Sequence, residues 1–129
     1  MLRVKNKPQQ GEKTMAQKLI TKEIETAFAK QGDTSEMGCE EIKVVCKFFN
    51  PMGAGTWYVY DRDPDCHDRL WAFCNLGDSE CAELGTISLS ELEELRLPLG
   101  MKIERDIHFD TLSMSLQDVI DKIKSGGHV

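Results

Sequence analysis

The chain has 129 residues, of which 40% are hydrophobic and 29% are charged, and its formal net charge is −6. These values are typical of one globular domain and exclude the disordered class of protein. No apolar run approaches the length of a membrane span, and the acidic charge disfavours direct binding to a nucleic-acid backbone, which requires clustered lysine and arginine. Such a charge suits binding to a basic protein surface.

The cysteines and the charge distribution indicate the compartment and the domain boundaries. Five cysteines occur without a secretory signal, so we expect reduced thiols in a cytoplasmic protein. Residues 1–17 are polar and basic and show no periodicity, which predicts a flexible basic tail. We expect residues 18–125 to form a single α+β domain, followed by a flexible C-terminus at 126–129.

The first predicted elements are a helix at 21–31 and a strand at 42–49. Thr21 suits the N-cap position, and apolar residues at helical spacing follow it. In the second segment, apolar and polar residues alternate, which predicts a half-buried strand. Its inner face is expected to carry Ile42, Val44, Cys46 and Phe48.

Further strands are predicted by alternation and by aromatic or β-branched content. They cover residues 56–60, 70–76 and 84–89, and a fifth strand is expected at 103–109. The connections between the first four strands are short, which favours antiparallel pairing of neighbours in a meander.

Two more helices are indicated by capping residues. A helix over 88–95 has capping-box spacing from either Ser88 or Ser90, and a final helical stripe begins after Ser113 or Ser115. The predicted fold class is therefore α+β: an antiparallel four- or five-stranded meander packed with about three short helices.

Aromatic residues on the second and third predicted strands are candidates for partner contacts. Neighbouring strand residues point to opposite faces, so some rings belong to the core and the others need a covering helix or partner. Tryptophan and tyrosine are favoured interface anchors, although core packing is their more common use. The interaction candidates are Trp57, Tyr58, Tyr60 and Trp71.

A second candidate lies on the expected fifth strand, where Glu104, Asp106 and His108 would share one face. Carboxylates beside a histidine can bind a metal ion or exchange protons. The simpler interpretation is a polar outer face, with Arg105 on the apolar side forming one structural ion pair. These four residues are also candidates for partner contacts.

Metal binding has weaker candidates. Zinc prefers cysteine and histidine ligands, which here would be Cys66, His67, Cys74 and Cys81. No Cys-x-x-Cys pair occurs, and Cys74 suits a core position on its strand, so no metal or other cofactor is expected.

The acidic run at 61–65 begins like a calcium-binding loop. However, Cys66 stands where that loop requires glycine, and Ala72 stands where it requires glutamate. The run therefore predicts a solvated hairpin loop.

Seven ordered segments together resemble the domain-of-unknown-function family 2958 over about residues 19–110, namely 19–24, 45–51, 56–59, 83–85, 88–93, 97–100 and 103–109. The cysteine-rich stretch 66–81 departs from the family pattern. The resemblance implies a short bacterial protein of the kind often encoded on plasmids, phages and integrative elements. It also implies an accessory role, including action against host defence, and it carries over no catalytic residue.

The leading hypothesis is a non-enzymatic accessory protein of a mobile element, acting as an acidic module that binds another protein. One alternative is a small metal-dependent enzyme that uses the face of Glu104, Asp106 and His108. The other alternative is a zinc-stabilised structural module.

Overall fold

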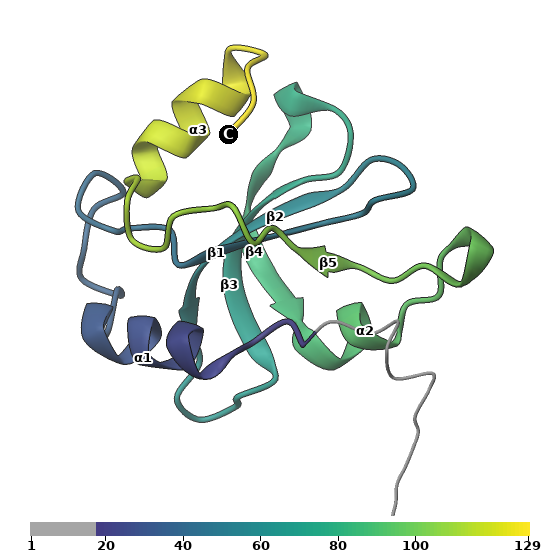
Figure 1. The fold of residues 1–129 in the computed structure, drawn as a ribbon. Helices are drawn as coiled ribbons and strands as arrows, with labels where there is room; N and C mark the ends of the chain where they lie inside the picture. The colour runs from purple at the N-terminus through teal and green to yellow at the C-terminus, as the bar shows by residue number, and fades with distance from the viewer. Residues whose placement is uncertain (1–17) are drawn as a thin grey trace, which may run out of the picture.

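The computed structural model of the protein describes residues 18–129 (Figure 1). They form a five-stranded antiparallel sheet with three α-helices, which confirms the predicted α+β fold. The strand order is β4-β3-β2-β1-β5, so the first four strands make the predicted meander and β5 adds beside β1. The strands are β1 (Cys46–Phe49), β2 (Thr56–Arg62), β3 (Arg69–Asn75), β4 (Glu83–Ser88) and β5 (Glu104–Arg105). The predicted tail at 1–17 lies outside the described residues.

Each α-helix begins at a side chain that caps it. The helices are α1 (Lys22–Gln31), α2 (Leu89–Glu94) and α3 (Leu116–Lys124), and short 3₁₀ turns cover Ser79–Cys81 and Pro98–Gly100. The hydroxyl oxygens of Thr21, Ser88 and Ser115 accept hydrogen bonds from backbone N–H groups in the first turns. Because such a bond satisfies an otherwise unpaired N–H, these residues fix where the helices start.

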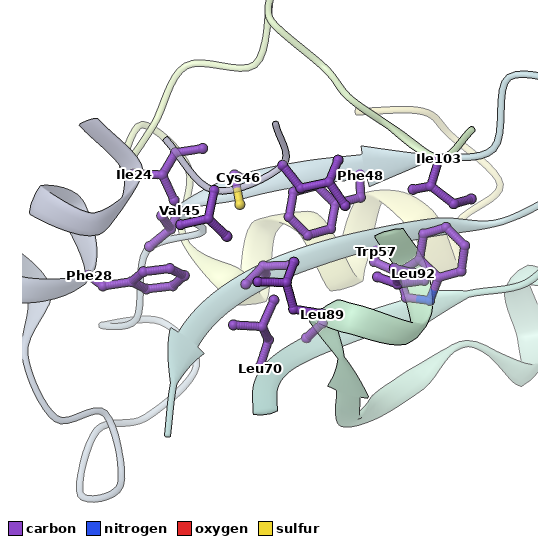
Figure 2. Packing of buried hydrophobic residues seen from close by; sticks show 14 of the residues in the cluster. Ile24, Phe28, Val45, Cys46, Phe48, Trp57, Leu70, Leu89, Leu92 and Ile103 are labelled. Atoms are coloured by element: carbon purple, nitrogen blue, oxygen red, sulfur yellow. The ribbon is translucent and has the colours of Figure 1, made fainter. Parts of the chain in front are cut away.

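The helices cover opposite faces of the sheet (Figure 1). On one face, α1 and α2 enclose a core in which Phe48 and Leu70 are fully buried (Figure 2). On the other face, α3 packs on a second core around Phe73 and Leu116. The chain after α3, expected to be a flexible end, places Val129 against this second core.

The predicted strand at 42–49 is shorter than expected, because only Cys46–Phe49 pairs with β2. Ile42 and Val44 are buried in the core beneath α3, whereas Cys46 and Phe48 are buried in the core beneath α1 and α2. The expectation that these four residues share one face is therefore wrong. The backbone turns between them, and the N–H of Val44 donates to the Met114 carbonyl at 3.0 Å instead of continuing the ladder.

The expected fifth strand is also shorter, since β5 comprises only Glu104 and Arg105. The N–H of Asp106 donates to the Lys47 carbonyl at 2.9 Å, and a turn follows in which the Asp106 carboxylate accepts from the N–H of His108. The side-chain acceptor offers the backbone an alternative to the ladder, which explains why the strand stops here.

A β-bulge in β2 controls the direction of the residues that follow it. Val59 pairs with Ala72, but the next pair along β3 is Asp61 with Trp71, so Tyr60 is the extra residue. Directly paired residues of antiparallel strands lie on the same face. The bulge therefore places the Asp61 carboxylate on the face that carries Trp71.

The side chain of Gln31, the last residue of α1, satisfies the backbone at this bulge. Its Nε2 donates to the Tyr60 carbonyl at 2.8 Å and to the Lys43 carbonyl at 2.9 Å. Its Oε1 accepts from the N–H of Lys43 at 2.6 Å. One amide group thus joins α1, β2 and the chain that leads into β1.

Replacing this amide is expected to weaken the fold. Gln31→Ala leaves the bulge carbonyl without its donor, and we expect the free energy of unfolding to fall by about 1–3 kcal/mol. Gln117→Ala is the matched control, because Gln117 bonds only to the exposed Asp121 side chain through its Nε2 and should cost less than about 0.5 kcal/mol. Urea unfolding measures the free energy of unfolding of both variants. Equal decreases for Gln31→Ala and Gln117→Ala would contradict the role given to Gln31.

Candidate functional site

A hollow of about 450 Å³ lies on the sheet face that α3 covers only in part. We call it the Asp61 cleft. Its floor is largely apolar and comprises Met37, Ile42, Tyr60, Trp71, Leu84 and Leu116. Its rim carries the carboxylates of Asp33, Asp61 and Asp63. A concave apolar floor with a few polar groups at its edge is the usual chemistry of a binding site.

Two large apolar side chains are exposed on this floor. Trp71 of β3 is 39% exposed and Leu84 of β4 is 44% exposed. Leu84 pairs across the ladder with Phe73, which is buried beneath α3. Because Leu84 itself is exposed, α3 covers the sheet at Phe73 but not at its neighbour on β4. Apolar groups left exposed inside a hollow are favourable contacts for a partner, because covering them removes apolar area from water.

The three rim carboxylates differ in whether a basic side chain forms an ion pair with them. Asp63 forms an ion pair with Arg69 at 3.2 Å. Asp61 accepts hydrogen bonds from the N–H and hydroxyl of Thr34, and Asp33 accepts from the N–H of Ser35 at 2.9 Å, which lowers the pKa of Asp33. Within residues 18–129 neither Asp33 nor Asp61 has a basic ion-pair partner. Arg62, which also lines the cleft, pairs with Glu25 instead, so both carboxylates stand at the rim without an ion-pair partner in this range.

Tyr60 belongs to the lining of the same cleft. Its side chain is only 9% exposed, and burial, followed by nearby Cys39 and Asp61, raises its pKa. The phenol therefore stays neutral at physiological pH and keeps its proton for donation. No residue between 18 and 129 forms a hydrogen bond with this hydroxyl. A buried tyrosine hydroxyl normally has a partner, so this one is available to a ligand.

A second hollow of about 500 Å³ adjoins the Asp61 cleft, since both are lined by Asp33 and residues 61–64. Its other wall comes from α1 through Glu25 and Phe28, with His67 at the edge. Arg62 lies between these walls, where its guanidinium is 3.6 Å from the Glu25 carboxylate and its Nε donates to the His67 carbonyl. The acidic run predicted to be a solvated loop thus separates two hollows.

The structure separates the predicted aromatic candidates. Trp57 is buried beneath α1 and α2, while Tyr58 and Tyr60 are buried in the core on the α3 side. Of these four aromatic residues, only Trp71 is exposed to solvent and so accessible to a partner. A partner-binding role for Trp71 stays a prediction, and the main contribution of the other three is packing of the sheet.

The predicted polar face on the fifth strand does not assemble, because the strand ends at Arg105 and His108 lies in the turn beyond it. Asp106 is 3.4 Å from the Lys47 ammonium and is therefore part of a structural ion pair. The guanidinium of Arg105 donates to the carbonyl oxygens of Lys18 and Leu19, which ties the chain before α1 to β5.

The weak zinc candidates are also kept apart. Cys66 and Cys81 are exposed and Cys74 is half-buried on β3. Burial raises the pKa of Cys74, and a hydrogen bond to Asp78 raises that of Cys81, so both favour the neutral thiol over the thiolate that zinc binds. In the described part of the chain no three His, Cys, Asp or Glu side chains converge as metal ligands.

Sequence reasoning missed Asp33 and Leu84 as site residues, and it considered Asp61 only as the start of an acidic run that resembles a calcium-binding loop. Asp33 is distant in sequence and reaches the cleft only because α1 returns the chain to β2. In the structure Asp61 continues strand β2, which extends to Arg62. The bulge that turns it toward Trp71 leaves no pattern of its own in the sequence.

The two tyrosines of the chain allow a test of this burial. Burial raises the pKa of Tyr58 to about 12, and the pKa of Tyr60 also lies above the ordinary value of 10.0. At about pH 10, tyrosinate absorbance should be lower in the folded protein than in urea, where the chain should be about half ionised. Since both pKa values are raised by folding, stability is retained below about pH 10 and declines as pH rises above it. Half-ionised tyrosine in the folded state would contradict the structure.

Removal of metal ions is expected to leave the fold unchanged. The four zinc candidates do not converge, so excess EDTA should shift the melting temperature by less than about 1 °C, a change too small for loss of a structural metal. Thermal unfolding with and without the chelator measures this. A large drop in the melting temperature would instead support the alternative of a zinc-stabilised structural module.

None of the helices within residues 18–129 has the length and hydrophobicity that crossing a bilayer requires.

No curated protein and no solved structure matches the chain. A family described as "Protein of unknown function (DUF2958)" matches residues 19–129, which is nearly the whole chain. The chain therefore belongs to the DUF2958 family, as its ordered segments suggested.

Proposed function

We propose that this protein is a non-enzymatic accessory protein that binds a basic segment of a partner protein in the Asp61 cleft. The observation that carries the proposal is the pairing of an exposed apolar floor with charge at its rim that lacks an ion-pair partner among residues 18–129. Trp71 and Leu84 supply the apolar contact, and Asp33 and Asp61 supply the charge. Buried aromatic anchors provide much of the affinity of protein interfaces, while complementary charges provide orientation and association rate.

The charge of the whole chain supports this choice of partner. A net charge of −6 attracts basic surfaces over a distance of about 8 Å at physiological salt and repels acidic ones. The rim then concentrates negative charge beside the apolar floor. A basic protein segment with apolar neighbours satisfies both features, whereas a purely polar cation leaves Leu84 uncovered.

The biological setting is part of the same proposal. The resemblance to short bacterial proteins of mobile elements supports an accessory role for a plasmid, phage or integrative element. We place the protein in the cytoplasm, where reducing conditions would keep its five unpaired cysteines as thiols. Interference with a host defence protein that carries a basic surface is the role that fits best.

Partner capture with matched surface variants tests the proposal. The tagged full chain is incubated at low salt with a bacterial lysate, beside the double variant Trp71→Ala/Leu84→Ser. The control is Leu76→Ser/Leu99→Ser, because those leucines are 67% and 88% exposed and lie outside the cleft. We expect the wild type and the control to retain the same protein, and the cleft variant to retain it roughly tenfold less.

Two further observations decide the outcome. Circular dichroism should be the same for all three proteins, which separates lost binding from lost folding. The captured protein should be released by moderate salt, since the rim charges are exposed. Equal retention by the cleft variant and the wild type would contradict the Asp61 cleft as the binding surface.

A further inference from the structure

We infer that the group recognised in the Asp61 cleft is the guanidinium of an arginine side chain, presented by a peptide segment of the partner. This inference rests on the proposed function and names the kind of partner residue that the cleft binds. Three independent features of the cleft carry it: an exposed indole ring on the residue paired with Asp61, two carboxylates without an ion-pair partner among residues 18–129, and the hydroxyl of Tyr60, which forms no hydrogen bond within that range.

The exposed indole ring belongs to a residue whose cross-strand neighbour is acidic. The bulge makes Asp61 the cross-strand partner of Trp71, and such pairs have Cβ atoms about 4.5–5.5 Å apart. A guanidinium is planar and weakly hydrated, so it can stack on the ring while its edge donates to the carboxylate. An ammonium can approach the same ring, but as a compact, strongly hydrated charge that does not offer a flat face.

The free acceptor capacity at the rim also favours several donors on one cation. The carboxylate of Asp61 takes the two donors of Thr34 and the N–H of Arg62, and the carboxylate of Asp33 takes the N–H of Ser35. Two carboxylates offer about eight acceptor sites, so several remain open. A guanidinium carries five N–H donors in a fixed fork, which lets one side chain serve both rim residues.

The hydroxyl of Tyr60 supplies a donor for the peptide segment that carries the arginine. Tyr60 is 9% exposed, and its hydroxyl keeps its proton and forms no hydrogen bond with residues 18–129. A backbone carbonyl next to the bound arginine would accept from it. The adjoining hollow of about 500 Å³ then receives a neighbouring side chain of the same segment.

Three short peptides test the inference on the full chain. They are acetyl-Gly-Leu-Arg-Leu-Gly-amide and its versions with lysine or citrulline at the centre, citrulline being the uncharged analogue of arginine. Binding is followed by indole fluorescence and by NMR chemical-shift changes. Trp71 is the exposed one of the two tryptophans, so it is the ring expected to respond. We expect the arginine peptide to bind about fivefold more tightly than lysine and about tenfold more tightly than citrulline.

Variants locate the binding. Asp33→Asn keeps an acceptor for the N–H of Ser35 but removes the charge, and it should weaken the arginine peptide about fivefold. Tyr60→Phe removes only the hydroxyl and should weaken it about threefold. The matched control is Asp110→Asn, an exposed carboxylate outside the cleft, which should change affinity less than twofold.

The outcomes separate this inference from the proposed function. Equal affinities for the arginine and lysine peptides, both weakened by Asp33→Asn, would overturn arginine selectivity and leave the basic-segment proposal standing. Equal binding of the citrulline peptide, or no shift of cleft resonances with any peptide at millimolar concentration, would overturn the inference itself. Partner capture with the Trp71 and Leu84 variant would then still decide the proposed function.

Discussion

Three short helices cover the two faces of a five-stranded sheet. The length of each helix determines which side chains of the sheet are buried and which stay exposed. The nine residues of α3 extend about 14 Å, whereas the seven residues of β3 extend about 23 Å. The helix buries Phe73 and stops short of Trp71. The Asp61 cleft is the uncovered remainder of this face, bordered by the chain between α1 and β1.

The predictable part of the fold is the part that local chemistry determines. Alternation together with aromatic and β-branched content located the four meander strands, and hydroxyl side chains placed the helix starts, because these signals act within a few residues. The change of face between Val44 and Cys46 could not be predicted, because three successive buried residues depend on which helix packs above them. The early end of β5 also left no mark in the alternating pattern, because it follows from the turn in which the Asp106 carboxylate accepts from the N–H of His108.

The acidic residues divide into those with structural partners and those without. Asp106 and Asp63 are compensated by Lys47 and Arg69, and exposed pairs of this kind contribute little to stability. Asp61 has no basic partner among residues 18–129, yet its hydrogen bonds with Thr34 hold it in place. A fixed charge that lacks a counter-ion is prepared for an external one, because little side-chain freedom remains to be lost on binding. From sequence all of these carboxylates look alike.

The irregular strand β2 also decides which charge faces which helix. A regular ladder would pair Tyr60 with Trp71 and would set Asp61 opposite Leu70, on the side of the sheet that α1 covers. With the surplus residue, Arg62 takes that position instead, and its guanidinium lies 3.6 Å from the Glu25 carboxylate of α1. An aspartate there would meet Glu25 as a like charge, which disfavours the ionised form of both groups. One inserted residue therefore sorts two neighbouring side chains of opposite sign to opposite faces of the sheet.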